Sequence, residues 1–341
     1  VAELLKRGYG VHGLVRGCTK NPAKAQHLRD LPSAEQNLKL FDGGDLSVKG
    51  SFDEAFNGAD AVVHTAAAVV LGKEHSIITA SVEGTRNVLD SVDASPSIKR
   101  FVHTSSIAAI QSYDKPKSYV FSEADWNEWS TIERGDAYGV AKTEAERIVH
   151  RHFEHDSNGR TAVALNPGVV IGPVMAKAHT KASSIFLRDL IYNNKVLTFP
   201  STYVDVRDVA AAHVNALEQL PELHGRRFVL TNDSPCMVTG ALELGSIAKR
   251  VFPNYKFDPR PQYSPATMSV VRTASHIPLI GSQIMTEVER VASFTPIQWN
   301  NSASRRELGI HYRPLEDTVR EGMESIVSLG YASFKPRRSR L

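Results

Sequence analysis

A tyrosine followed four residues later by a lysine can form a proton-donating pair, and this spacing occurs three times in the chain. The case at Tyr113 contains a proline that would break a helix, and the case at Tyr331 runs into a basic tail. Only "YGVAKTEAERIV" follows a good helical pattern, which places Tyr138 and Lys142 on one face. A free phenol has a pKa of about 10, so a fixed cation nearby is needed for acid chemistry near neutral pH. The pair therefore predicts general acid catalysis at Tyr138.

Hydroxyl side chains gather upstream of this helix, in "RFVHTSSIAAI". The apolar start of this segment predicts a strand, with Thr104, Ser105 and Ser106 at its carboxyl end. Hydroxyls at that end of a parallel strand face the ligand crevice. Capping of the strand end is the alternative reading, because Ser and Thr often hydrogen-bond to nearby backbone. Hydroxyls and a Tyr/Lys helix flanking one crevice favour catalysis.

Strand and helix patterns alternate through the first half of the chain. Near-continuous apolar strands separated by helices indicate a parallel sheet that is covered on both faces. The sequence thus predicts an α/β fold with a doubly wound, Rossmann-like parallel sheet, whose ligands lie at the carboxyl ends of the strands. The predicted helices cover 22–30, 51–57, 76–93 and 136–154, and the predicted strands lie at 11–16 and in "NLKLFDGGDL", "ADAVVHTAAAV", "RFVHTSS" and "TAVALNPGVVIG".

The alternation weakens past residue 171. We expect residues 1–170 to form the dinucleotide-binding domain and residues 171–341 to form mainly a smaller substrate lobe. Residues 200–220, in "FPSTYVDVRDVAAAHVNAL", are expected to return to the first domain. A last amphipathic helix follows in "PLEDTVREGMESIVSL".

Composition limits the function classes. Hydrophobic residues make up 42% and charged residues 23% of the 341, as in ordinary globular proteins. The net charge is +3, with much of the excess in the C-terminal tail, which argues against a nucleic-acid-binding face. Two cysteines form neither a disulfide framework nor a zinc site, and no other metal site is expected. No apolar run is long enough for a transmembrane helix.

Several other residues invite a functional reading that we do not favour. Gly8, Gly10 and Gly13 match G-x-G-x-x-G, but they follow a helical pattern and lead into a strand, the reverse of the dinucleotide fingerprint. His64 and His103 at strand ends are interpreted as structural residues with satisfied hydrogen bonds. The tryptophans of "EADWNEWS" could line the substrate mouth or pack their own loop.

The ordered set of motifs resembles the extended short-chain dehydrogenase/reductases of the NAD-dependent epimerase/dehydratase superfamily. Within them it is most similar to the dihydroflavonol-reductase-like group of NADPH-dependent ketone and aldehyde reductases. The resemblance covers residues 1 to about 327. It rests on "LLKRGYGVHGLVRG", "DGGDL", "ADAVVHTAA", "SVEGTRNVLDS", "RFVHTSS", "YGVAKTEAE", "LNPGVVIGP", "TYVDVRDVAAAHV" and "RRELGI".

The resemblance implies roles for the candidate residues. Tyr138 would protonate the substrate oxygen as hydride arrives at carbon. Lys142 would lower the pKa of the phenol and hydrogen-bond the nicotinamide ribose. Ser106 would polarise the carbonyl, with Ser105 as the alternative if the register slips by one. Cofactor contacts are implied for Asp45 and Leu46 beside the adenine, Thr65, Ala66 and Ala67 beside the ribose and pyrophosphate, and Pro167, Val169 and Val170 along the nicotinamide.

Basic residues at the end of the first strand indicate which cofactor is used. An acidic side chain there would bind a ribose 2′-hydroxyl and repel a 2′-phosphate. This chain has Arg16 instead, followed by Lys20 and Lys24, and no carboxylate competes within "RGCTKNPAK". A planar guanidinium suits a phosphate. The sequence therefore predicts NADP(H), unless this is simply a solvated basic loop.

We expect an NADP-dependent oxidoreductase that reduces a small ketone or aldehyde to an alcohol. The alternatives within enzymes are a sugar-nucleotide epimerase/dehydratase or a 3β-hydroxysteroid dehydrogenase. The alternatives outside enzymes are a dinucleotide-binding regulator or an inactive truncated fragment. We expect a cytoplasmic monomer or homodimer with no nucleic-acid or membrane partner. The final tripeptide, Ser339-Arg340-Leu341, resembles a peroxisomal address and leaves that compartment as an alternative.

The similar family begins with a strand and a glycine-rich turn ahead of the helix that opens this chain. We expect both to precede Val1 in the full-length protein. The turn supplies backbone N–H groups for the pyrophosphate, and the strand is central in a doubly wound sheet. Residues 1–341 alone are then expected to be poorly soluble and to bind no measurable NADPH, whereas the upstream segment should restore both. Tight NADPH binding by residues 1–341 in calorimetry would contradict this expectation.

Overall fold

The computed structural model describes residues 1–66, 74–116, 118–181, 183–196, 200–233, 236–237, 239–261 and 297–336, without the side chains of residues 74 and 75. Two predictions fall outside these ranges. They are the cofactor contact that the resemblance implies for Ala67, and the final tripeptide that leaves a peroxisomal address as an alternative.

A parallel sheet of four strands forms the centre of the fold. Its order is β10 (Arg227–Leu230), β6 (Thr161–Pro167), β4 (Arg100–Thr104) and β3 (Ala61–His64). Because all three pairings are parallel, crossover connections join the strands. The register pairs His64 with His103 and His103 with Ala164. The predicted parallel α/β sheet is confirmed.

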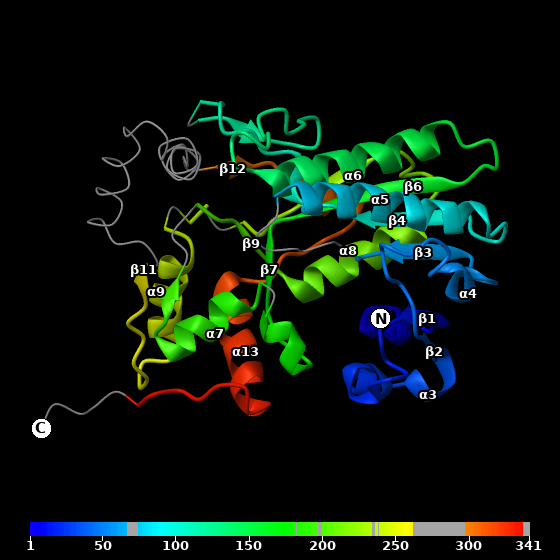
Figure 1. Cartoon of the computed structure of the whole chain (residues 1–341). Coiled ribbons are helices and arrows are strands. Elements are labelled where there is room, and N and C mark those ends of the chain that lie inside the picture. The colour runs from blue at the N-terminus through cyan, green and yellow to red at the C-terminus, as the bar shows by residue number, and fades with distance from the viewer. Residues whose placement is uncertain are drawn as a thin grey trace, which may run out of the picture.

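Helices cover both faces of this sheet (Figure 1). On one face, α5 (Glu74–Asp93) and α6 (Ala137–Glu154) lie side by side and bury Phe101 of β4 against Phe153. On the other face, α8 (Val206–Glu218) packs on β4 and β6. Each strand therefore has apolar side chains in both directions, which explains the near-continuous apolar runs in the sequence.

The N-terminal segment forms a second parallel pair, β1 (Val11–Leu14) with β2 (Leu38–Phe41). Helix α1 (Ala2–Lys6) precedes it, and Gly8 has φ +83° in the connection. The glycines of the G-x-G-x-x-G match thus join the end of a helix to a strand, as predicted. Short helical turns complete this region: η1 (Pro22–Ala25), α2 (Gln26–Arg29), α3 (Ala34–Asn37) and α4 (Asp53–Phe56).

The second half of the chain builds a separate apolar core. Helices α7 (Ile185–Tyr192), α9 (Ala241–Val251) and α13 (Leu315–Ser328) pack together beside the pair β7 (Val169–Ile171) and β9 (Tyr203–Asp205). The remaining elements are η2 (Ile107–Ala109), η3 (Lys177–Lys181), α12 (Ser302–Glu307), and the pairs β5 (Val120–Phe121) with β12 (Gln298–Trp299) and β8 (Lys195–Val196) with β11 (Arg260–Pro261).

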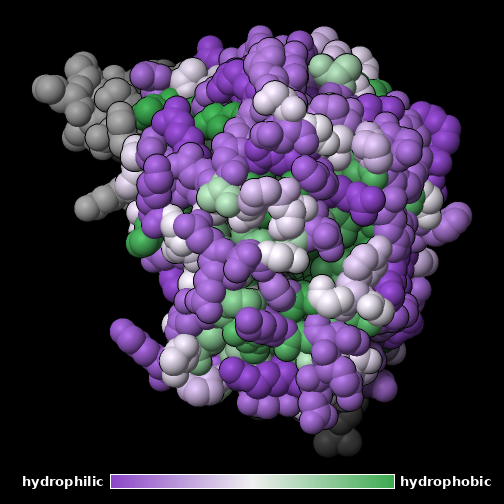
Figure 2. Space-filling model, turned by 90° about the vertical axis from the view of Figure 1, so that its right-hand side faces the viewer, coloured by the Kyte–Doolittle hydropathy of each residue, from purple (hydrophilic) through white to green (hydrophobic). Residues whose placement is uncertain are grey.

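The face that Figure 2 turns to the viewer is mainly hydrophilic, with hydrophobic residues visible between the polar ones. Among the described residues, no helix combines the length and the apolar character needed to cross a membrane.

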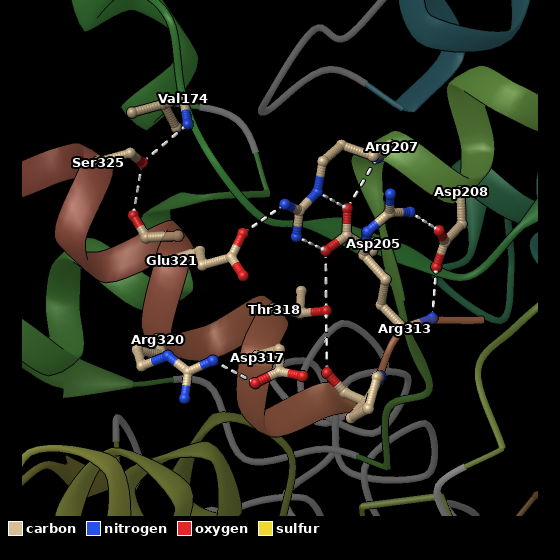
Figure 3. Close-up of polar contacts among 12 residues, drawn as sticks. Val174, Asp205, Arg207, Asp208, Arg313, Asp317, Thr318, Arg320, Glu321 and Ser325 are labelled. Carbon is tan, nitrogen blue, oxygen red and sulfur yellow. Dashed lines mark hydrogen bonds and ion pairs between the residues drawn. The ribbon is translucent and has the colours of Figure 1, made fainter.

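A buried ion pair ties the start of α8 to α13 (Figure 3). Asp205, only 1% exposed, caps α8 by accepting from the Arg207 backbone N–H at 2.8 Å. The Arg207 guanidinium donates to both carboxylate oxygens, at 2.9 and 2.7 Å, and also to Glu321 of α13. Thr318 of α13 donates to Asp205 at 2.8 Å. Burial opposes the charge on Asp205, but these bonds prevail and lower its pKa.

We expect Arg207→Met to lower the free energy of unfolding by about 2–3 kcal/mol, because it leaves the Asp205 carboxylate buried without its guanidinium. Arg320→Met is the matched control, since Arg320 pairs with Asp317 on the exposed side of α13 and should contribute about 1 kcal/mol or less. Urea unfolding of both variants measures the difference. Equal losses would contradict the assignment.

Candidate active site

Helix α6 presents Tyr138, Lys142 and Glu146 at four-residue intervals, so the three side chains follow one face. Its first turn is held by Asp136, which accepts from the Gly139 N–H at 3.1 Å. Gly139 is required there because a Cβ would collide with the Ser130 hydroxyl. The Asp136 cap and the close packing at Gly139 therefore hold the first turn of α6, and with it Tyr138, in place.

Ser106 follows the end of β4, and its hydroxyl accepts from the Ala108 N–H at 3.1 Å. The Ser106 hydroxyl also lies close to the Tyr138 phenol, where it acts to lower the pKa of that phenol. Ser105 points elsewhere, because its hydroxyl donates to the buried Glu146 carboxylate. The structure thus brings Ser106, and not the alternative Ser105, to the phenol.

The phenol of Tyr138 has a raised pKa. Burial raises the pKa most, the nearby Ser106 hydroxyl lowers it, and the charge of Asp136 raises it. The residue as a whole is 46% exposed. The resemblance implies that Lys142 lowers the pKa of Tyr138. In this structure the pKa is raised, and Lys142 is not among the groups that shift it.

Lys142 lies beside the end of β4, and its ammonium donates to the Thr104 carbonyl at 3.5 Å. Burial lowers the pKa of Lys142 to about 8, while the Glu146 carboxylate raises it. The amine is therefore mostly charged at neutral pH.

A small cavity of about 20 Å³ lies between the sheet and the helix pair α5 and α6. It joins the catalytic candidates on α6 to two residues predicted to contact the cofactor, Leu46 and Ala66. Its lining comprises Leu46, His64, Ala66, Ser81, Thr85, His103, Tyr138, Ala141, Lys142 and Ala145.

Helix α5 approaches Leu46 closely, because a Cβ on Gly84 would lie 2.8 Å from the Leu46 Cβ. Asn87 of α5 also donates to the Leu46 carbonyl at 2.8 Å. Thr65 and Ala66 follow the end of β3 and are exposed.

Pro167 ends β6, and Val169 and Val170 lie in β7 directly after it. Gly168 joins the two strands where a Cβ would come within 2.6 Å of the Thr202 carbonyl. The predicted nicotinamide-side segment thus lies at the carboxyl end of the central sheet.

Arg16 and Lys20 follow β1 and are exposed. The Arg16 guanidinium lies 3.4 Å from the Asp45 carboxylate, and the Asp42 carboxylate accepts from the N–H groups of Gly17 and Thr19 at 2.6 and 2.8 Å. The segment "RGCTKNPAK" itself holds no carboxylate, as predicted, but two carboxylates approach it in the fold. The acidic groups come from the segment after β2, which the local sequence did not reveal.

His64 and His103 stack across β3 and β4 with ring centroids 5.6 Å apart. Burial lowers the pKa of His64 to about 4 and that of His103 well below its ordinary value. Neither ring nitrogen of His103 has a hydrogen-bond partner within the described part of the chain. The prediction that His103 has satisfied hydrogen bonds is therefore wrong.

Three buried polar residues behind the site were not predicted: Glu146, Asn166 and Arg227. The repeat of the four-residue spacing after Lys142 is the one signal that could have identified Glu146. Trp126, which was considered for the substrate mouth, packs its ring under the Arg227 guanidinium at 3.8 Å. Among the described residues, no cluster of His, Cys, Asp and Glu could hold a metal ion.

Comparison with known proteins finds relatives in one enzyme family. The sequence profile of the NAD dependent epimerase/dehydratase family matches residues 1–230. Tetraketide alpha-pyrone reductase 2 of Arabidopsis thaliana is 32% identical over 268 residues, covering 76% of this chain and 80% of that protein. Cinnamoyl-CoA reductase CAD2 of Medicago truncatula is 30% identical over 348 aligned positions, covering 98% and 93%. The structure of Gre2 from Candida albicans in complex with NADPH superposes with a TM-score of 0.76 at 25% identity, covering 96% and 94%.

We expect His103→Leu to raise the free energy of unfolding by about 1 kcal/mol, because it removes two buried nitrogens that lack partners. His213→Leu is the matched control. His213 is also buried, but its ring nitrogens contact the Thr104 hydroxyl at 2.6 Å and the Val209 carbonyl at 2.7 Å, so its loss should destabilise. Denaturant unfolding would refute the interpretation if both variants were destabilised alike.

Proposed function

Because the chain belongs to the NAD dependent epimerase/dehydratase family, we propose that it reduces the carbonyl group of a small ketone or aldehyde to an alcohol with NADPH. The observation that carries the proposal is the placement of the Ser106 hydroxyl close to the Tyr138 phenol, with Lys142 one helical turn further along α6.

Each of the three side chains has a chemical task in carbonyl reduction. The Ser106 hydroxyl can donate to the substrate oxygen and polarise the carbonyl. Tyr138 keeps its proton at neutral pH, because its pKa is raised, and can release it to the same oxygen. The Lys142 ammonium lines the same cavity as the phenol and can donate to the nicotinamide ribose. When bound, NADPH supplies the hydride.

The residues around the cavity fit a dinucleotide. Leu46 and Ala66 line the same cavity as Tyr138 and Lys142, which places apolar contacts beside the proposed proton donor. Arg16 and Lys20 are exposed after β1 and present positive charge suited to a ribose 2′-phosphate. The bond between Arg16 and Asp45 is long and exposed, so little energy opposes its exchange for a phosphate.

The named relatives support the reductase among the possible activities of this family. Tetraketide alpha-pyrone reductase 2 and cinnamoyl-CoA reductase CAD2 are reductases by name, and Gre2 has been solved with NADPH. On this proposal, residues 1–170 with 200–220 bind the dinucleotide, and the rest of 171–341 selects the carbonyl compound.

Tyr138→Phe should lower kcat by about 10²–10⁴-fold with NADPH affinity retained, since only the proton donor is lost. The assay is NADPH oxidation against a panel of ketones and aldehydes. Tyr331→Phe is the control, because Tyr331 has the same spacing to a lysine outside the site. Turnover of Tyr138→Phe within twofold of the unmodified protein would refute the assignment.

Arg16→Asp should lower the preference for NADPH over NADH, measured as the ratio of the two kcat/KM values, by at least about tenfold. The new carboxylate would repel the 2′-phosphate and accept from a 2′-hydroxyl. Arg29→Asp makes the same charge change on exposed helix α2 and should leave the ratio unchanged. An unchanged ratio in Arg16→Asp would show that Arg16 does not contact the cofactor.

A further inference from the structure

We propose that Glu146 is a positioning residue of this reductase: its carboxylate fixes the Ser105–Ser106 end of β4 and keeps Lys142 charged. The proposal rests on the carbonyl reduction proposed above. It extends the row of Tyr138 and Lys142 by one further turn of α6.

Glu146 is completely buried, yet several polar groups from neighbouring elements converge on its carboxylate. The Ser105 hydroxyl and the Asn166 amide, at 2.8 Å, donate to one oxygen. The Arg227 guanidinium donates to the other oxygen at 2.5 Å. An ionised carboxylate accepts at both oxygens, so it can satisfy all three donors, whereas a glutamine amide would place N–H groups against them.

The same contacts reach the proposed catalytic serine. Asn166 uses its amide nitrogen a second time, donating to the Ser106 carbonyl at 3.1 Å. Glu146 therefore fixes Ser105 directly and the Ser106 backbone through Asn166. Since Ser106 lies close to the Tyr138 phenol of the same helix, Glu146 completes a set of contacts between α6 and the end of β4.

Glu146 also determines the charge environment of Lys142. The titratable groups that face the Lys142 amine are Tyr138 and Glu146 on its own helix, His64 on β3 and His103 on β4. Both imidazoles are neutral at neutral pH, because their pKa values are lowered. Among the described residues, Glu146 is thus the anion that opposes the loss of the Lys142 proton.

The charge on Glu146 is itself well supported. Burial opposes it, but the contacts from His150, Arg227 and Ser105 lower the pKa of Glu146 to about 2. His150 lies on the same helix with its ring nitrogen 3.8 Å from the carboxylate, and Arg227 comes from β10. His103 of β4 also lies within electrostatic range of Glu146. The carboxylate therefore stays ionised over the whole range in which Lys142 titrates.

The test measures the Lys142 amine directly, by competitive acylation at a series of pH values with mass spectrometry of the Lys142 peptide. This readout needs no turnover. In Glu146→Gln the pKa of Lys142 should fall by about one unit or more below its value in the unmodified protein, because an opposite charge is lost. The alkaline pH at which kcat/KM for the carbonyl compound declines should also be lower in this variant, by the same number of pH units.

Further variants separate electrostatics from loss of structure. Arg227→Gln breaks the same buried ion pair but keeps the carboxylate, so it should not lower the pKa of Lys142. The double variant Glu146→Gln/Arg227→Gln leaves no unpaired buried charge. It should lower the pKa of Lys142 as much as Glu146→Gln alone does. Glu144→Gln is the matched control, since Glu144 lies on the same helix and is partly exposed.

An unchanged or raised pKa of Lys142 in both variants that lack Glu146 would overturn the proposal. The proposal would also be overturned if Arg227→Gln lowered the pKa of Lys142 as much as Glu146→Gln does. Loosening of the site, and not loss of the Glu146 charge, would then be the cause. If the unmodified protein reduces no carbonyl compound while the acylation shift occurs, the proposed reduction fails and the effect of Glu146 on Lys142 stands.

Discussion

A single buried carboxylate joins helix α6 to three neighbouring strands of the central sheet. Glu146 accepts from Ser105 after β4, from Asn166 of β6 and from Arg227 of β10. Removing a carboxylate from water costs several kcal/mol, so such a group persists only where donors surround it. The constraint works in both directions. The strands must place their donors in register, and α6 must lie at one depth and rotation for its carboxylate to meet them.

The position of α6 in turn determines the geometry of the site. With Glu146 fixed, the helical repeat places Lys142 beside the Thr104 carbonyl and Tyr138 beside Ser106. At the other end, the Asp136 cap and the close packing at Gly139 stop the helix from sliding along its axis. The three aligned side chains are thus held from both ends of one rigid element, which gives better-defined positions than a loop could.

The sequence predicts what depends on local pattern. Periodicity predicts the parallel sheet. It also identifies Tyr138 and Lys142, because only this one of the three Tyr-x-x-x-Lys matches lies in a helical pattern. It misses what depends on contacts between distant segments. Arg227 lies 81 residues from Glu146, and neither segment alone shows that they meet. The carboxylates that approach the loop after β1 likewise come from another strand, and the lack of partners at His103 follows from what the fold places around it.

Burial has opposite consequences for the two titrating groups of the site. It raises the pKa of Tyr138, so the phenol keeps the proton that a general acid must hold, and it lowers that of Lys142 to about 8. In each case the protein disfavours a lone charge. A raised pKa means that the site as a whole disfavours the phenolate, so Tyr138 gives up its proton only to a stronger base. In the proposed reaction, hydride addition to the carbonyl carbon forms such a base, the alkoxide oxygen, and that oxygen takes the proton beside a Lys142 ammonium that Glu146 helps to keep charged.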